Sequence, residues 1–226
     1  DLLWTLSGPT GTGTPRSFQA TDGFEANPLL RLVPGDYTFT VDGQGDATGE
    51  YRFRLLDLAA APSLTVGTPV TGTLLPARET DLYRFTGTAG DRLFFDHTLA
   101  SGFTSAPSWR LVDPLGTVRF TEDLRTDVGP FTLPLTGPYT LLLEGRIFDG
   151  AASASYGFTV GAVSDGAGTL TLDAPVGGAI DEPGELDRYT FTLPTETLLA
   201  IDSLTSRSDL LWTLSGPTGT GTPRSF

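Results

Sequence analysis

Residues 64–96 read LTVGTPVTGTLLPARETDLYRFTGTAGDRLFFD, and residues 170–202 read LTLDAPVGGAIDEPGELDRYTFTLPTETLLAID. The two stretches align over their whole length without a gap. In both, apolar and polar residues alternate between short turns rich in Gly, Pro and Thr, as in DLYRF at 81–85. Alternation places successive side chains on opposite faces of a strand. The pattern predicts an all-β fold in which antiparallel strands form a β-sandwich or jelly roll.

The similarity continues beyond these stretches. Residues 208–220 align with 105–117, which places Trp212 on Trp109, and residues 35–43 align with 137–145. The sequence therefore contains two related domains, A and B, each of about 100 residues and large enough for one hydrophobic core.

Residues 1–18 and 209–226 are identical, DLLWTLSGPTGTGTPRSF in both places. An exact duplication at a spacing of 208 residues predicts a tandem array in which A and B alternate. In this interpretation residues 1–58 are the back part of one domain A, whose front part belongs to the preceding repeat. Residues 59–165 are a complete domain B, and residues 166–226 are the front part of the next domain A.

Composition excludes several classes of function. The chain has no Cys, no Met and no Lys, so it can form no disulfide or thiolate metal site and no Lys-based phosphate loop. Its net charge of −13 disfavours nucleic acid and anionic membrane as partners. No apolar run approaches the length of a transmembrane helix.

The aromatic residues of the alternating segments are expected to form the core. Each lies on the same face as other apolar residues, which favours burial over a sugar-stacking surface for the three Trp. The predicted core residues are Trp4, Trp109, Trp212, Tyr83, Phe85, Tyr189 and Phe191.

The order of these motifs resembles the bacterial pre-peptidase C-terminal domain. The motifs are D-x-Y-x-F, an apolar strand ending in Asp, W-x-L-x-x-P-x-G, G-x-Y-x-(apolar)-x-(apolar) and a closing Y-x-F strand, and they cover nearly the whole repeat. The resemblance implies a secreted β-sandwich of a kind commonly appended to extracellular proteases, with calcium binding in collagen-binding relatives. The acidic position ahead of the family's Trp is matched by Asp1 and Asp209 in A, whereas B has Ala106-Pro107 there.

Catalysis is not expected. His97 is the only His and follows Asp96, but no G-x-S-x-G turn accompanies it, and domain A has Ser203 at the equivalent position. Neither of the Gly/Thr-rich loops leads into a helix N-terminus, so neither is a phosphate loop. We predict no catalytic and no cofactor-binding residue.

Structural calcium is the alternative that acidic loops leave open. Asp42, Asp46 and Glu50 surround one predicted hairpin, and the stretch DEPGELD at 181–187 contributes Asp181, Glu182, Glu185 and Asp187. Calcium prefers six to eight oxygen ligands, often from such loops. Neither stretch has a known calcium-loop spacing, and Asp and Gly are also common turn residues. The sequence therefore predicts no metal site.

Domain B differs from A on its outward positions. Three large apolar residues fall there: Leu82, Phe94 and Leu142. Their counterparts in A are polar or small: Arg188, Ala200 and Thr40. Apolar side chains on a surface often mark a contact, so we expect these three residues to be covered by an adjoining domain or another chain.

These features together favour a structural, extracellular tandem-repeat protein that forms a stalk, fibre or filament at the cell surface. Its partners would be neighbouring copies of the repeat, in the same chain or adjacent chains. Two alternatives remain: a secreted module that binds polysaccharide or extracellular matrix in adhesion, and the accessory tail of a secreted hydrolase.

Overall fold

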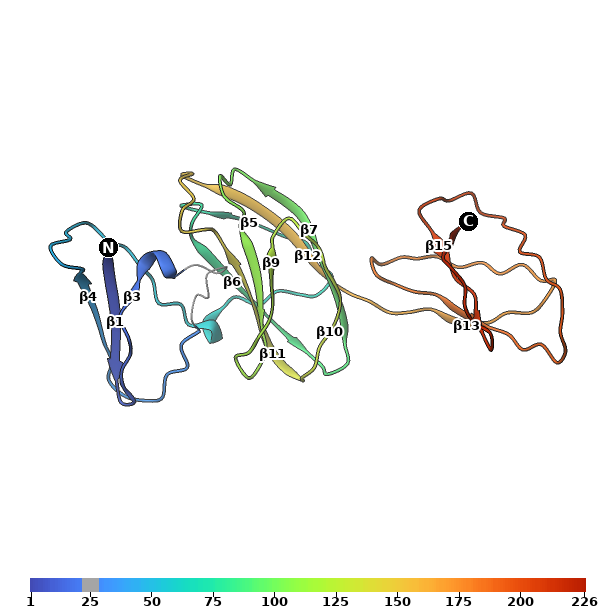
Figure 1. Cartoon of the computed structure of the whole chain (residues 1–226), viewed down its shortest axis with the longest axis horizontal. Helices are drawn as coiled ribbons and strands as arrows, with labels where there is room; N and C mark the ends of the chain where they lie inside the picture. Colours follow the sequence, from blue (N-terminus) through green and yellow to red (C-terminus); the bar gives the residue numbers. More distant parts are fainter. Residues whose placement is uncertain (22–28) are drawn as a thin grey trace. The chain divides into compact units, whose positions relative to one another are not determined.

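A computed structural model describes residues 1–21 and 29–226 of the chain. These residues form β-strands with two short 3₁₀ helices, η1 (Phe18–Ala20) and η3 (Leu58–Ala60). They divide into two compact units (Figure 1). The first comprises Asp1–Gly168 and Pro175–Arg188, and the second comprises Thr169–Ala174 and Tyr189–Phe226. No helix among the described residues has the length and apolarity needed to cross a membrane.

The middle of the first unit is a β-sandwich of two four-stranded antiparallel sheets (Figure 1). One sheet has the order β10 (Val128–Thr132), β7 (Arg92–Ser101), β12 (Ala154–Ala162) and β5 (Val70–Leu74). The other has the order β6 (Thr80–Gly87), β11 (Gly137–Glu144), β8 (Ser108–Val112) and β9 (Val118–Asp123). All these strands lie within the predicted domain B, and the predicted all-β sandwich is confirmed.

Alternation along the strands builds the core of this sandwich. Tyr83 and Phe85 on β6 face inward beside Leu141 and Tyr139 of β11, with which they are directly paired. Trp109 on β8 is completely buried and meets Phe95 of the opposite sheet edge-to-face. Burying rings of this size contributes most of the apolar free energy that holds two sheets together.

Residues 1–58 contain a smaller sheet. Its strands are β1 (Leu2–Gly8), β2 (Gly11–Thr12), β3 (Arg16–Ser17) and β4 (Thr38–Gly43). β1 lies between β4 and the short strands β2 and β3. Residues 51–57, which alternate as a strand in the sequence, belong to no strand of the structure.

The remaining strands are short. They are β13 (Ala167–Thr169), β14 (Arg188–Thr190), β15 (Leu211–Trp212), β16 (Ser215–Gly216), β17 (Gly219–Thr220) and β18 (Arg224–Ser225). They pair two by two, β13 with β14, β15 with β18 and β16 with β17. Among the described residues, therefore, no strand of 1–58 pairs with a strand of 166–226. The predicted boundary at residue 166 is not a boundary between the compact units, because residues 175–188 group with the first unit. The assignment of the two terminal ranges to successive copies of domain A stays a prediction.

Candidate interfaces on the outer faces of the central sandwich

The three outward apolar residues of domain B lie on two different sheets. Leu82 of β6 is directly paired with Leu142 of β11, so the two share the outer face of one sheet. Phe94 lies on β7, in the other sheet. Leu142 is only 4% exposed, and Leu82 and Phe94 are half-buried. Leu142 is thus not a solvent-exposed side chain, and the contact of these three residues with an adjoining domain or another chain stays a prediction.

The face that carries Leu82 and Leu142 is largely withdrawn from water. Arg110 of β8 is paired with Leu142 in the sheet and forms an ion pair with Glu144 of β11 at 2.7 Å. The two charged side chains are 3% and 2% exposed. Burying a charged side chain costs desolvation free energy, which is offset only where an oppositely charged partner lies within reach. On this outer face the two charges are therefore paired with each other and buried within the single chain.

The chain that leads into domain B contacts the edge of this sheet. Arg54 forms an ion pair with Glu79 at 2.5 Å and donates to the carbonyl oxygen of Thr80 at 2.9 Å. Arg84 of β6 donates to the carbonyl oxygen of Ala59 at 2.9 Å. Since Arg54 and Ala59 flank the link between A and B, these bonds fix that link against β6.

The opposite outer face meets the chain that leaves domain B. Phe94 lies there beside Gly129 of β10 and Gly184. A Cβ atom on Gly129 would lie 2.9 Å from the Phe94 ring, and one on Gly184 would lie 3.3 Å from it. A Cβ atom on Gly161, the residue of β12 paired with Phe94, would be 3.7 Å from the carboxylate of Glu182. Glycines at these positions let residues 182–184 approach the sheet closely.

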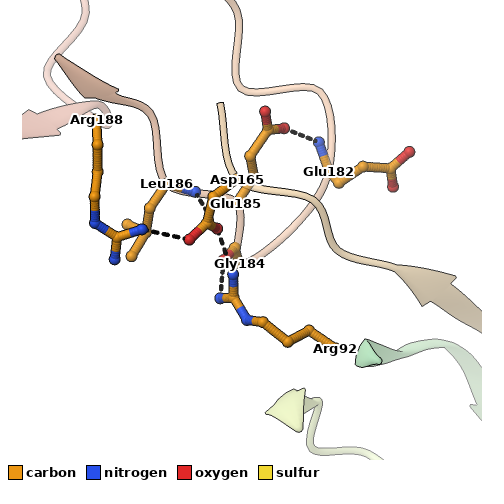
Figure 2. Close-up of polar contacts among 7 residues, drawn as sticks. All are labelled: Arg92, Asp165, Glu182, Gly184, Glu185, Leu186 and Arg188. Atoms are coloured by element: carbon orange, nitrogen blue, oxygen red, sulfur yellow. Dashed lines mark hydrogen bonds and ion pairs between the residues drawn. The ribbon is translucent and has the colours of Figure 1, made fainter. Parts of the chain in front are cut away.

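Asp165 fastens the same link through two arginines (Figure 2). Its carboxylate forms ion pairs with Arg92 of β7 and with Arg188, the latter at 2.5 Å, and accepts a hydrogen bond from the backbone N–H of Leu186 at 3.2 Å. Arg92 also reaches the carbonyl oxygen of Gly184 at 3.4 Å. The hydrogen bond from Arg92, followed by that from Arg188, holds the pKa of Asp165 below its usual value. Asp165 therefore joins the central sandwich to the segment that follows it.

The acidic loops act as turn residues. The carboxylate of Glu185 accepts hydrogen bonds from the backbone N–H groups of Asp181 and Glu182 at 2.7 and 3.0 Å, the second of which Figure 2 draws. In the other loop Asp42, near the end of β4, is exposed, as are Asp46 and Glu50. In the described part of the chain, no three acidic or His side chains gather into a group that could hold a metal ion.

His97 does not face a nucleophile in the described contacts. It is half-buried on β7, and its backbone N–H donates to the carboxylate of Asp127 at 2.8 Å. No described hydrogen bond joins its ring to a Ser or Asp, so the geometry of a catalytic triad is not assembled at this position.

The predicted core residues differ in burial according to their domain. In B, Trp109 and Phe85 are buried and Tyr83 packs half-buried against the core. In A, Trp4 is 6% exposed, whereas Trp212 and Phe191 are half-buried and Tyr189 is 39% exposed. The less buried of the A residues are thus those that lie in residues 166–226.

One polar cluster lies inside the central sandwich. The Tyr156 hydroxyl of β12 donates to Asp81 of β6 at 2.7 Å and lies 2.6 Å from the Tyr83 hydroxyl. Burial raises the pKa of Tyr156, and its bonds with Asp81 and Tyr83 raise it further. Burial also raises the pKa of Tyr83. Both hydroxyls therefore stay protonated at neutral pH, and the cluster connects the two sheets.

Sequence reasoning missed the ion pairs on both outer faces of the sandwich. Arg110 stands in SWRLV at 108–112, where every residue is buried although only alternate ones face the core. An Arg at an outward strand position ordinarily lies in solvent, so nothing in the sequence indicated that this one is buried. Asp165 has no sequence signal either, because its two partners are distant in the sequence.

Comparisons with known proteins concern the fold. No protein-family model and no curated protein matches this chain. Among solved structures it is similar to the pre-peptidase C-terminal domain of collagenase from Bacillus anthracis, with 16% identity over 48% of this chain and 99% of that domain, at a TM-score of 0.37. The domain type is the one that the sequence motifs resemble.

Two further solved structures are similar to this chain. Both are PliG, a periplasmic inhibitor of g-type lysozyme. The protein from Aeromonas hydrophila shares 13% identity over 44% of this chain and 95% of its own, at a TM-score of 0.34. The protein from Salmonella Typhimurium shares 16% identity over 44% and 97%, at a TM-score of 0.33. All three TM-scores lie below 0.5, and the likenesses carry no statement about activity.

Proposed function

We propose that this chain is a non-catalytic, extracellular structural protein whose β-sandwich domains stack in tandem into a stalk, fibre or filament. The observation that carries the proposal is the pair of fastened links on either side of domain B. Arg54 and Arg84 hold the entering chain, and Asp165 holds the leaving chain through Arg92 and Arg188. A flexible tether between binding modules would need no such bonds.

The burial of charge on the outer face supports the same function. Arg110 and Glu144 are buried by residues of this same chain, so this outer face of domain B is covered without a second copy. In a series of domains, such a face would hold the adjoining domain in one packing position. The duplicated residues 1–18 and 209–226 supply the series. Partners would then be further copies of the repeat.

Imaging of the native assembly tests this proposal directly. We expect fibres with a regular axial repeat in negative-stain electron micrographs, because fixed links give successive domains a constant orientation. Separate globular particles at all concentrations would contradict the proposal. Arg92→Met should make the fibres more flexible, because it removes one of the two arginines that hold Asp165. Arg125→Met is the control: it removes the surface ion pair between Arg125 and Asp123, whose charged atoms are 2.6 Å apart and which takes part in neither link.

A second candidate function is attachment to polysaccharide, and the aromatic residues of 1–58 favour it. Trp4 stacks on Phe39 at 5.3 Å between ring centroids, and Phe39 stacks on Phe53 at 4.3 Å. Phe53 and Tyr51 are 44% and 53% exposed. Exposed aromatic rows stack against sugars, so titration of the chain with soluble polysaccharides, followed by Trp fluorescence, distinguishes a binder from a structural protein.

The counterparts of these aromatic residues argue for the structural proposal. Tyr51, Phe53 and Trp4 correspond in the repeat alignment to Tyr156, Phe158 and Trp109, and those three are buried in the core of B. Since the matching aromatic residues form the core of the complete domain B, those of residues 1–58 are more simply explained as core residues of domain A.

A further inference from the structure

Residues 1–58 reproduce the back half of domain B without its front half. β1 pairs with β4 so that Trp4 lies opposite Val41, just as β8 pairs with β11 so that Trp109 lies opposite Leu143. Tyr37 donates its hydroxyl to the carbonyl oxygen four residues earlier at 2.8 Å, and Tyr139 does the same at 2.8 Å. Register and turn are thus shared, so the complete domain B is a template for domain A.

The template shows where a front half would add. In B, the free edge of β11 is taken by β6, with Tyr83 opposite Leu141. In A, the equivalent strand is β4, which pairs with β1 and with no other strand in the described part of the chain. In B, β5 pairs with β12, with Val70 opposite Phe158. The equivalent of β12 is the stretch around Phe53, which is in no strand.

The missing strands correspond to residues 170–202. The repeat alignment places Tyr189 on Tyr83 and Val176 on Val70. This segment exposes many of its apolar side chains, among them Val176, Ile180, Tyr189 and Ile201 at 39–58%. Leaving such groups wet forgoes about 25 cal/mol for each Å² that could be buried.

The polar cluster of B gives the correspondence a chemical signature. Its members are Asp81 and Tyr83 in the front half and Tyr156 in the back half, and Gly72 makes room for the ring. A Cβ atom on Gly72 would lie 2.2 Å from the Tyr156 hydroxyl oxygen. Domain A retains all four residue types at the aligned positions: Asp187, Tyr189, Tyr51 and Gly178. Three of them lie in residues 170–202, and Tyr51 lies in residues 1–58.

We propose that residues 170–202 of one copy complete the half-sandwich formed by residues 1–58 of the next copy. The inference deepens the proposed function and rests on its succession of copies. In the composite domain the Tyr51 hydroxyl donates to Asp187 and meets the hydroxyl of Tyr189, as Tyr156 does with Asp81 and Tyr83. Strand Val176–Ile180 pairs with residues 49–53, and the strand around Tyr189 pairs with β4.

The occupant comes from another copy because of the order of the sequence. Residue 202 is followed after six residues by residues 209–226, which are identical to residues 1–18. The front segment of each copy is thus already joined to a β1-like stretch of its own. Residues 1–58 of the same chain precede domain B, whereas residues 170–202 follow it and lead directly into a stretch identical to the start of the next copy.

Cysteine cross-linking tests the pairing, and the chain offers a clean background because it has no Cys. Thr73 of β5 lies opposite Ser155 of β12 in B, on the outer side of the strands. The aligned residues in A are Ala179 and Glu50. Directly opposed residues of antiparallel strands have Cα atoms about 4.5–5.5 Å apart, which is within the range for a disulfide.

Two full-length chains, one with Glu50→Cys and one with Ala179→Cys, are mixed under mild oxidation. We expect a heterodimer band on non-reducing gels that neither variant forms alone and that a reductant removes. The double variant Thr73→Cys, Ser155→Cys is the positive control and should close within one chain. Thr195→Cys, whose counterpart Ala89 lies in the turn between β6 and β7, replaces Ala179→Cys as the negative control.

Three outcomes overturn the inference. The first is that no heterodimer forms although the positive control closes its disulfide, and the second is that the Thr195→Cys chain gives as much heterodimer as the Ala179→Cys chain. The third is that a chain carrying both Glu50→Cys and Ala179→Cys forms the disulfide only within itself. Native fibres could still form in each case, so failure here is distinct from failure of the proposed function.

The polar cluster is tested separately. Tyr51→Phe should lower the affinity between chains several-fold, up to about tenfold for one hydrogen bond. Tyr156→Phe, the matched change inside B, should leave that affinity unchanged. Equal effects of the two variants would contradict the assignment of Tyr51 to the composite site.

Discussion

The same eighteen residues occur twice in this chain and adopt two different states. In both copies the hairpin has the same register, with Ser7 opposite Thr12 in one and Ser215 opposite Thr220 in the other. In the first copy β1 runs unbroken over Leu2–Gly8, and Trp4 is 6% exposed. In the second copy the long strand is broken into β15 and β16, and Trp212 is half-buried.

The difference between the two copies is the strand β4. β4 pairs with β1 along its whole length and places Phe39 against the Trp4 ring, whereas among the described residues β15 pairs only with β18 and β16 only with β17. A hairpin is thus specified by its own sequence, through the turn and the cross-strand pairs. A buried Trp is not, because its cover comes from residues far away in the chain.

The largest effect in this comparison is expected from truncating the three Trp residues. Trp109→Ala should lower the free energy of unfolding of domain B by about 3–5 kcal/mol, the cost of removing a large core ring. Trp4→Ala and then Trp212→Ala should cost successively less, because the Trp4 ring is less completely buried than the Trp109 ring and the Trp212 ring is only half-buried. Urea unfolding followed by circular dichroism measures all three. A cost for Trp212→Ala as large as that for Trp109→Ala would mean that the second copy is covered in solution.

Much of this fold could be predicted from the sequence. Alternation in DLYRF, YTFTV and LLWTL assigns the inward faces, and the repeat alignment places B at 59–165 as a complete sandwich. Alternation could not show whether Leu142 is wet or covered, because it describes faces and not neighbours. It also could not find Asp165, whose role depends on Arg92 and Arg188 meeting in space. The stretch YRFRL at 51–55 alternates well yet forms no strand, since a strand needs a partner that these residues lack here.

The buried ion pair is expected to have the second-largest effect. Arg110→Met leaves the Glu144 carboxylate buried without its partner and should destabilise the first unit by about 3 kcal/mol. The double variant Arg110→Met, Glu144→Leu should recover most of the loss, because both charges are removed. Denaturant unfolding of the two single variants and the double variant forms the cycle. Single variants that unfold like the parent chain would show that this outer face is hydrated.

Asp149 gives a smaller, pH-dependent effect inside the complete domain. Its buried carboxylate accepts hydrogen bonds from the backbone and hydroxyl of Thr104 at 2.9 and 2.8 Å, and from the backbone N–H of Ser105 and Ala151 at 3.0 and 2.9 Å. Burial raises the pKa of Asp149, but the hydrogen bonds, led by that from Ala151, outweigh it and hold the pKa below the usual value.

The stability from Asp149 is therefore present above its unfolded pKa of about 4 and is lost as the pH falls through the lower folded pKa. Asp149→Asn should cost about 1.5–3 kcal/mol at pH 7. It should also flatten the fall in melting temperature from about one unit above to about two units below that unfolded pKa. Asp46→Asn, a change at an exposed turn of residues 1–58, is the control. An unchanged pH profile in Asp149→Asn would remove this carboxylate from the acid response.

The smallest effect separates local from long-range structure within the duplicated stretch. Gly11 and Gly219 close the two identical hairpins with φ angles of 108° and 114°, a region that residues with a Cβ atom rarely adopt. Alanine at either position should strain its own turn by about 1 kcal/mol. Gly11→Ala should appear in the global unfolding of the first unit, because its hairpin is joined to β4 through β1. Gly219→Ala should leave global unfolding unchanged and only speed amide exchange at Gly221, whose N–H bonds to the carbonyl oxygen of Leu214 at 2.9 Å. If both substitutions shift global unfolding equally, the second hairpin is part of a larger packed structure in solution, and the contrast between the two copies fails.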